Sequence, residues 1–155
     1  MSEHTLDLVW NRQSPGFSYE EFNRDHLLIF NERNRVCASA APAYHGNAEC
    51  VDPEQAFVAS LASCHMLTFL AIASKKGFVV NSYRDHATGV LGRNDQRKPA
   101  ITNVKLQPSV VFDKEHAPTA DQYESLHERA HDTCFISNSI AQCVKVETAP
   151  EMSVE

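Results

Sequence analysis

The fold of this chain is decided by Pro53–Gly77, PEQAFVASLASCHMLTFLAIASKKG, its longest apolar-rich run. Asp52 is a favourable N-cap, and Pro53 occupies a first-turn position that tolerates proline. Gly77 supplies the left-handed residue that commonly ends a helix. These signals predict one α-helix, about 36 Å long. Because apolar residues fall nearly all round this helix, we expect it to be buried on most sides.

The predicted helix has the length of a membrane span, but its composition argues against that role. It contains serine, threonine and histidine side chains, ends in two lysines, and stands alone as an apolar segment in the sequence. We therefore predict that it is a core helix.

The composition is that of a soluble globular protein, with 155 residues, 43% hydrophobic and 22% charged, and a net charge of −6. This length suits a single domain, which we predict to span residues 1–155. The negative charge argues against binding to nucleic acids or anionic membranes, which attract basic surfaces. The N-terminal residues include Glu3 and Asp7 and show no signal peptide, so we expect a cytoplasmic protein.

Shorter patterns before and after the long helix predict strands and a second helix. The expected strands are 6–10, 27–30, 35–38, 78–91, 101–112 and 144–147, and the second helix runs from Pro118 to Thr133. The tail after Pro150 is expected to fray. This order predicts an α+β fold with antiparallel sheets around the long central helix. A helix this apolar needs cover on all sides, which suggests a homodimer whose two copies wrap each other's helix.

The five cysteines are odd in number and form no CxxC pair, so neither a zinc ribbon nor a thioredoxin-type motif is present. A reducing cytoplasm argues against structural disulfides. We therefore expect Cys37, Cys50 and Cys143 to be bystanders, with Cys50 the most reactive of the three. Cys64 and Cys134 differ from these because Cys64 lies mid-helix and Cys134 lies at an expected helix start, where N–H groups favour a thiolate.

Two such cysteines suit the reduction of peroxides. A low-pKa, accessible thiolate attacks the peroxide and becomes a sulfenic acid, which a second thiol resolves as a disulfide. A cation holds the thiolate and polarises the O–O bond, and a carboxylate holds that cation in place. Taken alone, each cysteine is more simply interpreted as an inert core residue.

Two motifs in matching order give the chain a wider likeness: Pro53-Glu54-Gln55 leading to Ala62-Ser63-Cys64, and Cys134 followed by Ser137-Asn138. In these motifs, and over nearly its whole length, the chain resembles the OsmC/Ohr family of thiol-dependent peroxidases. The resemblance implies an OsmC-like fold, an intertwined homodimer and the reduction of organic hydroperoxides. It also implies an external dithiol reductant, a lipoyl or thioredoxin-like protein, and no bound cofactor or metal.

The resemblance further implies roles for four residues: Cys64 as peroxidatic cysteine, Cys134 as resolving cysteine, Glu54 as the carboxylate of the Pro-Glu motif, and Arg24 as the activating arginine. The chain departs from the family pattern at His65–Phe69, where the better-known branch has other, mostly apolar residues. It also departs at Phe135, where many members have proline. These departures bear on the preferred peroxide and the reductant. Tyr44 and Phe57 are candidates to line an apolar pocket for an alkyl hydroperoxide.

The spacing of Glu54 and Cys64 places them roughly 15 Å apart along a continuous helix, too far for direct contact. Three arrangements stay open. The helix is interrupted, Arg24 bridges the two residues, or Glu54 and Arg24 reach the thiol from the partner subunit. We favour the third, because it fits an active site at a dimer interface.

Two other functions compete with peroxide reduction. A redox-sensing or ligand-binding protein on the same fold would show little turnover. A metal-binding module would need ligands whose spacing matches no standard site: His45, Cys50, Cys64 and His65. A catalytic pair of Cys64 and His65 is disfavoured, because neighbours on a helix point about 100° apart. His65 is therefore expected to fill the core or an interface.

Overall fold

The computed structural model describes residues 2–140 and 143–155. They cluster into two compact units, Met1–Ala56 and Phe57–Glu155, called here the N-terminal unit and the C-terminal unit. The long helix begins in the first unit and continues in the second. The single domain predicted for residues 1–155 stays a prediction.

The N-terminal unit is built on one small antiparallel sheet. Its strands, in the order β1-β2-β3, are β1 (Asp7–Val9), β2 (His26–Ile29) and β3 (Arg35–Ala38). A short 3-10 helix, η1 (Pro42–Tyr44), follows β3. Val51 then runs parallel to the free edge of β3 and forms a bridge with Ala38. This bridge leads the chain directly to the start of the long helix.

The long helix α1 (Pro53–Lys75) has the ends that the sequence predicts. Asp52 Oδ1 accepts the Gln55 N–H at 2.7 Å, and Gln55 Oε1 accepts the Asp52 N–H at 3.1 Å, so the helix begins with a reciprocal cap. At the other end Gly77 has φ of 81°, and the Phe78 N–H donates to the Ala73 carbonyl. Both predicted caps are confirmed.

The burial of α1 differs from the prediction. Its buried residues recur every fourth position and form one narrow stripe: Leu61, His65, Phe69 and Ala73. Leu67, on another face, is 60% exposed. The expectation that this chain buries α1 on most sides is therefore wrong, because its own sheets and second helix cover one stripe. By length and overall hydropathy α1 is also long and apolar enough to cross a membrane, although its serine, threonine and lysine side chains weigh against that role.

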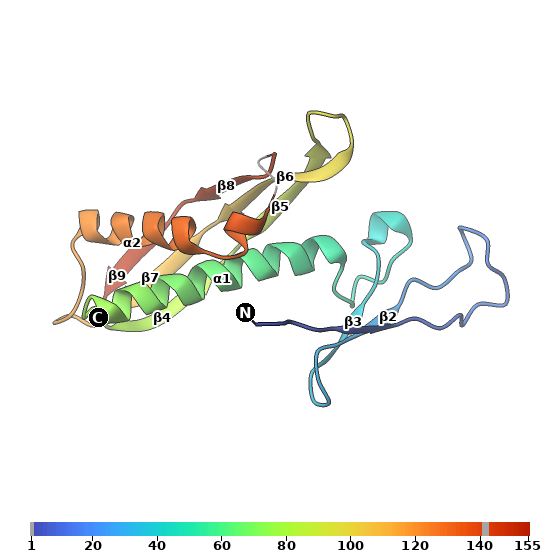
Figure 1. The fold of residues 1–155 in the computed structure, drawn as a ribbon, viewed down its shortest axis with the longest axis horizontal. Helices are drawn as coiled ribbons and strands as arrows, with labels where there is room; N and C mark the ends of the chain where they lie inside the picture. Colours follow the sequence, from blue (N-terminus) through green and yellow to red (C-terminus); the bar gives the residue numbers. More distant parts are fainter. Residues whose placement is uncertain (1, 141–142) are drawn as a thin grey trace. The chain divides into compact units, whose positions relative to one another are not determined.

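The C-terminal unit consists of two three-stranded sheets, a second helix and most of α1 (Figure 1). One sheet has the order β4-β7-β9 and the other β5-β6-β8. The elements are β4 (Val80–Asp85), β5 (Thr88–Arg93), β6 (Pro99–Leu106), β7 (Pro108–Phe112), α2 (Ala120–Thr133), η2 (Ser137–Ser139), β8 (Lys145–Thr148) and β9 (Glu151–Val154).

Two hydrophobic clusters divide the core of this unit. The first joins α1, β7 and α2 through Phe69, Phe112 and Leu126. The second joins α1 to β6 and to the end of α2 through Leu61, Val104 and Cys134. Aromatic and aliphatic side chains thus fill the core between α1, α2 and the sheets. Cys134 is a buried member of the second cluster.

The α+β class is confirmed, but the sheets are mixed. β8 pairs in parallel with β6, and β9 pairs in parallel with β7. The tail after Pro150 forms β9 and does not fray, contrary to the prediction. The expected strands 78–91 and 101–112 are each two strands, because the chain moves from one sheet to the other at residues 86–87 and at Gln107.

Candidate active site

Cys64 and Cys134 lie together in the C-terminal unit, although they are far apart in the sequence. Cys64 comes from the middle of α1 and is half-buried, whereas Cys134 directly follows α2 and is fully buried. Both pack in the cluster around Leu61 and Val104. The two side chains are close enough for each to shift the pKa of the other. The fold therefore creates the proximity that a two-cysteine mechanism requires.

The surroundings of Cys64 favour its thiolate. Partial burial opposes ionisation, but hydrogen bonds outweigh this effect and hold the pKa of Cys64 below its usual range. The donors are, in order of importance, the Cys134 thiol, the Ile136 and Phe135 N–H groups, and the Thr68 hydroxyl. Hydrogen-bond donors stabilise the negative charge of a thiolate, and the half-buried position leaves the Cys64 sulfur partly accessible.

Cys134 has the opposite character, and its position corrects the sequence prediction. It is the C-cap of α2, its N–H donating to the His131 carbonyl, and not the first residue of a helix. Burial, followed by its hydrogen bond to Cys64, raises the pKa of Cys134 to about 11. The Ser137 N–H lies 3.4 Å from its sulfur. Cys134 is thus protonated at pH 7; the Phe135 and Ile136 N–H groups lower the pKa of Cys64, whereas the Ser137 N–H donates to the Cys134 sulfur.

Thr68 is a residue of this site that the sequence analysis did not identify. Its hydroxyl donates to the Cys64 carbonyl at 2.8 Å and also contributes to the lowered pKa of Cys64. One hydrogen can serve one acceptor at a time, so Thr68 can shift its bond as the charge on sulfur changes. A signal was present in the sequence, because residues four apart share one face of a helix.

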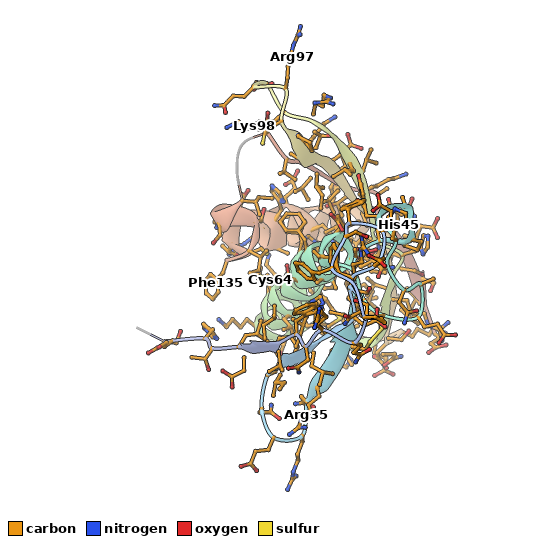
Figure 2. All side chains as sticks on the ribbon, turned by 90° about the vertical axis from the view of Figure 1, so that its right-hand side faces the viewer. Arg35, His45, Cys64, Arg97, Lys98 and Phe135 are labelled. Atoms are coloured by element: carbon orange, nitrogen blue, oxygen red, sulfur yellow. A yellow bond between two sulfur atoms is a disulfide. The ribbon has the colours of Figure 1, made fainter. Side chains whose placement is uncertain are left out.

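Phe135 directly follows Cys134 and is exposed beside the site. Its backbone N–H helps to lower the pKa of Cys64, while its side chain is 83% exposed. Figure 2 shows the ring beside Cys64 and projecting from the ribbon. A large apolar side chain is therefore presented to solvent next to the reactive sulfur.

His65 points into the core, as expected. Its Nε2 lies 3.0 Å from Nδ1 of His127, and the two rings stack with an interplanar angle of 6°. Burial lowers the pKa of His65 to about 4 and that of His127 to about 3, so both rings are neutral at pH 7. The pair belongs to the packing between α1 and α2.

Arg24 lies in the N-terminal unit beside a groove. Its guanidinium donates to the carbonyls of Phe22 and Tyr19 and stacks on the Phe22 ring, 3.8 Å from the ring centroid. The groove has a volume of about 370 Å³ and an almost wholly apolar lining that includes Trp10, Phe17 and Phe22. Arg24 is thus a cation placed at an aromatic groove.

Glu54 lies in the first turn of α1. Since α1 is one helix from Pro53 to Lys75, the arrangement with an interrupted helix is wrong. Among the described residues Arg24 forms no ion pair with a carboxylate. Bridging by Arg24 and action from a partner subunit stay open, and the roles of Glu54 and Arg24 stay predictions.

Cys37 and Cys50 form a disulfide in the N-terminal unit. The expectation that no structural disulfide forms is therefore wrong, and neither Cys37 nor Cys50 is a free bystander thiol. The bridge between β3 and Val51 brings the two residues side by side, and sequence spacing alone contains no sign of that pairing. Cys64, Cys134 and Cys143 are free.

The other candidates find less support. Within residues 2–140 and 143–155, no group of three or more His, Cys, Asp or Glu is arranged to hold a metal ion. Tyr44 is exposed in η1. Phe57 packs against the cluster around Leu61. Neither of these two aromatic residues is among the described lining of the Arg24 groove.

Comparison with known proteins gives the chain its family. No curated protein matches it. It is similar to a solved OsmC-like protein of unknown function from Vibrio cholerae, at 42% identity over 97% of this chain and 99% of that one, with a TM-score of 0.91. Its fold is also similar to that of an organic hydroperoxide resistance protein OsmC, a predicted redox protein, from Legionella pneumophila, at 16% identity, 97% and 99% coverage and a TM-score of 0.69.

A third similar fold is that of the organic hydroperoxide resistance protein OhrB of Bacillus subtilis, at 15% identity, 96% and 98% coverage and a TM-score of 0.61. Residues 46–149 match the OsmC-like protein family. This stretch contains α1, both free thiols of the site and the strands β4 to β8 of the C-terminal unit. The chain therefore belongs to the OsmC-like protein family.

Proposed function

We propose that this protein is a thiol-dependent peroxidase that reduces organic hydroperoxides, with Cys64 attacking and Cys134 resolving. The observation that carries the proposal is the opposite character of the two neighbouring sulfurs. Hydrogen bonds favour the thiolate of Cys64, and burial keeps Cys134 protonated. The names of two proteins with similar folds, both organic hydroperoxide resistance proteins, support the same reaction.

The reaction follows from this arrangement in three steps. The Cys64 thiolate attacks the outer peroxide oxygen, the O–O bond breaks, and the leaving alkoxide takes a proton to become an alcohol. Cys134 then attacks the Cys64 sulfenic acid, which releases water and forms the Cys64–Cys134 disulfide. An external dithiol reduces that disulfide, returning both thiols and leaving as its own disulfide. No bound cofactor or metal takes part.

The N-terminal unit suits an alkyl hydroperoxide. Its groove combines the aromatic surface of Trp10 and Phe22 with the cation of Arg24. The aromatic surface would take the apolar tail, and the guanidinium would polarise the O–O bond. Glu54 is proposed to hold Arg24 in place during the reaction.

We also propose that two copies form the working enzyme, in the cytoplasm, and that Arg24 and Glu54 act on the partner's thiol. The large apolar surfaces left exposed on α1 and the N-terminal unit support a second copy, with Leu67, Leu8 and Phe17 each more than half exposed. Two inactive variants test the arrangement. Mixing Cys64→Ser protein with Arg24→Ala protein creates one intact site per mixed dimer if Arg24 acts in trans.

Random exchange of subunits would then restore about a quarter of the wild-type activity, since half of the dimers are mixed and each has one working site. If Arg24 acts within its own chain, the mixture stays as inactive as its components. Light scattering of the wild-type protein measures the oligomeric state in the same samples, and a monomer contradicts the proposal directly.

Turnover is the direct test of the reaction. Cumene hydroperoxide, tert-butyl hydroperoxide and hydrogen peroxide are compared, with lipoyl dithiol and thioredoxin as reductants in turn. We expect the organic peroxides to be consumed faster, and Cys64→Ser to abolish consumption. Cys134→Ser should allow a single turnover, followed by overoxidation of Cys64 to the sulfinic acid. Cys143→Ser is the matched control and should retain activity.

The same assay separates the competing function. A redox sensor would oxidise once with one equivalent of peroxide and would not turn over when dithiol is added. Unchanged peroxide consumption in Cys64→Ser protein would contradict both the peroxidase and the redox sensor.

A further inference from the structure

The Cys37–Cys50 disulfide holds the segment that leads into α1. Cys37 lies on β3, and Cys50 lies beside Val51, whose N–H donates to the Cys37 carbonyl at 3.0 Å. The loop between the two cysteines contains η1 and His45, which adopts a left-handed φ of 64°. The disulfide therefore closes a short loop, with a separation of 13 residues, directly before the helix that carries Glu54 and Cys64.

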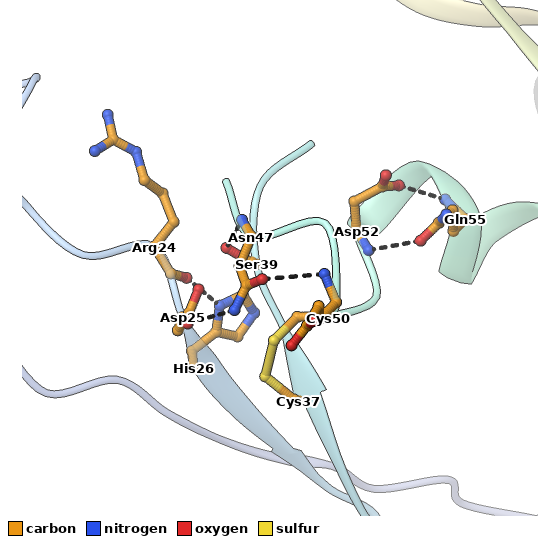
Figure 3. The surroundings of a disulfide bond; sticks show 10 residues. Arg24, Asp25, His26, Cys37, Ser39, Asn47, Cys50, Asp52 and Gln55 are labelled. Atoms are coloured by element: carbon orange, nitrogen blue, oxygen red, sulfur yellow. Dashed lines mark hydrogen bonds between the residues drawn. A yellow bond between two sulfur atoms is a disulfide. The ribbon is translucent and has the colours of Figure 1, made fainter. Parts of the chain in front are cut away.

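The closed loop also contacts the residue next to Arg24. Asn47, inside the loop, donates from Nδ2 to Asp25 Oδ2 at 3.0 Å, and its N–H donates to Ser39 Oγ at 3.1 Å (Figure 3). Hydrogen bonds from Asn47 and Ser39 lower the pKa of Asp25. The disulfide, Asn47 and Asp25 thus form one connected region, called here the corner. Asp25 is the sequence neighbour of Arg24.

The disulfide is open to attack. Cys37 is exposed even in its oxidised form, and β3 is the outer strand of its sheet. Thiol–disulfide exchange requires a thiolate to approach one sulfur, so exposure decides which disulfides react without unfolding. In a reducing compartment, moreover, protein disulfides are usually transient and serve catalysis or sensing. Cys134, by contrast, is fully buried and within reach of Cys64.

We propose that Cys37 and Cys50 form a second redox site, which dithiols open in the folded protein and which controls the order of the Asn47–Asp25 corner. One thiolate of the dithiol attacks the Cys37 sulfur, the S–S bond breaks, and Cys50 leaves as a thiolate that takes a proton. The second thiol of the dithiol then displaces Cys37. Two electrons and two protons pass to the protein, and the oxidised dithiol leaves; the reverse exchange closes the site again.

The first experiment measures this exchange in full-length Cys64→Ser protein, in which the Cys64–Cys134 disulfide cannot form. Samples are treated with dihydrolipoamide with and without urea, trapped with N-ethylmaleimide and cleaved after glutamate. Cleavage after Glu49 separates Cys37 from Cys50, so mass spectrometry assigns each thiol. We expect both to be freed in native protein at a rate within about tenfold of the rate in urea. Oxidised lipoamide should close the site again.

Two results would overturn the redox site. One is a disulfide that stays closed in native protein at dithiol concentrations that open it in urea. The other is a pair of free thiols in purified protein that oxidised lipoamide fails to join. The single variant Cys50→Ser, with Cys37 as a permanent thiol, gives the labelling rate of an open site.

The second experiment measures the effect on the corner. Hydrogen exchange at Ser39, Asn47 and Val51 should be at least about tenfold faster in the reduced protein and in the Cys37→Ser/Cys50→Ser variant than in the oxidised protein. Exchange in α2 should not change. Equal exchange at the corner in both states overturns the proposed control of order.

The consequence for catalysis rests on the proposed function, through Arg24. Peroxide kcat/KM should be several-fold lower in the Cys37→Ser/Cys50→Ser variant, with the alkylation rate of Cys64 unchanged. If wild-type protein consumes no peroxide, the proposed function fails while the exchange measurements still decide the second redox site. If the double variant has wild-type kcat/KM, the link from this site to Arg24 is overturned.

Discussion

The two units of this chain are stabilised by different means. The C-terminal unit has both hydrophobic clusters, with large side chains such as Phe69 and Phe112 fully buried. In the described part of the N-terminal unit only Ala38 and Ser39 are buried. There a disulfide, a few hydrogen bonds and aromatic rings in tilted contact hold the chain together. Cys64 and Cys134 thus lie in the unit with the larger core, and the proposed second redox site lies in the unit with little buried surface.

The largest expected difference concerns stability. Phe69 packs against the rings of Tyr83, Tyr123 and His127, so Phe69→Ala should lower the free energy of unfolding by about 3–5 kcal/mol. Phe17 is an aromatic residue of the N-terminal unit and is mostly exposed, so Phe17→Ala should cost about 1 kcal/mol or less. Urea unfolding followed by circular dichroism gives both values. Equal losses would mean that the two units share one core.

The two units should also respond to acid at different pH. Below pH 6.5 an unfolded chain protonates His65 and His127, whereas burial keeps them neutral when folded, to about pH 4 and about pH 3. Stability therefore falls with decreasing pH in this window, by about 1.4 kcal/mol per pH unit for each histidine. Replacing the pair, as His65→Leu/His127→Phe, should remove this slope. His86→Gln, at an exposed histidine, should preserve it, and a slope that survives in the double variant would contradict the assignment.

The corner of the N-terminal unit should remain ordered in that window. The hydrogen bonds from Asn47 and Ser39 lower the pKa of Asp25, so its contribution to stability is complete above the ordinary carboxyl value of 3.8. It is lost only as the pH falls through the lowered value. Hydrogen exchange of the Asn47 amide at pH 5 should therefore match that at pH 7, after correction for intrinsic rates. Asp25→Asn removes the charge, and faster exchange in that variant at both pH values is the expected control.

A smaller effect is expected at Thr68. Thr68→Val keeps the shape of the side chain and removes a hydroxyl that lowers the pKa of Cys64, so the pKa of Cys64 should rise. Thr68→Ser should restore it. Alkylation of reduced protein by iodoacetamide as a function of pH measures the pKa. Thr133→Val is the matched control, because the Thr133 hydroxyl makes the same kind of bond, to the Arg129 carbonyl at 2.6 Å. An equal shift in both variants would mean that helix geometry, and not the bond to sulfur, is responsible.

The same contrast explains how much the sequence could predict. The ends of α1 were predictable because Asp52, Pro53 and Gly77 act through neighbouring backbone groups. The α+β class also followed from sequence, whereas the role of Cys64 stays a prediction. By contrast, the parallel pairing of β9 with β7 joins segments that are far apart in the sequence. From its neighbouring residues alone, Pro150 predicts the start of a frayed tail.

Long-range contacts also explain the errors at the site. Whether Cys134 begins or ends a helix depends on where α2 stops, and the chain at that point has no glycine or proline to mark the end. The Cys37–Cys50 disulfide depends on the bridge between Ala38 and Val51, which no spacing rule contains. The backbone N–H groups of Phe135 and Ile136 help to lower the pKa of Cys64. Their positions depend on the fold, and the identities of the two side chains do not predict them.

The most direct test of the central claim is the product of one turnover at the two neighbouring sulfurs. Reduced wild-type protein receives one equivalent of cumene hydroperoxide, and peptide mass spectrometry then identifies the oxidised cysteines. The account predicts a Cys64–Cys134 disulfide and one equivalent of the alcohol. A Cys64 that remains a free thiol, while the peroxide is consumed and another cysteine is oxidised, would contradict it.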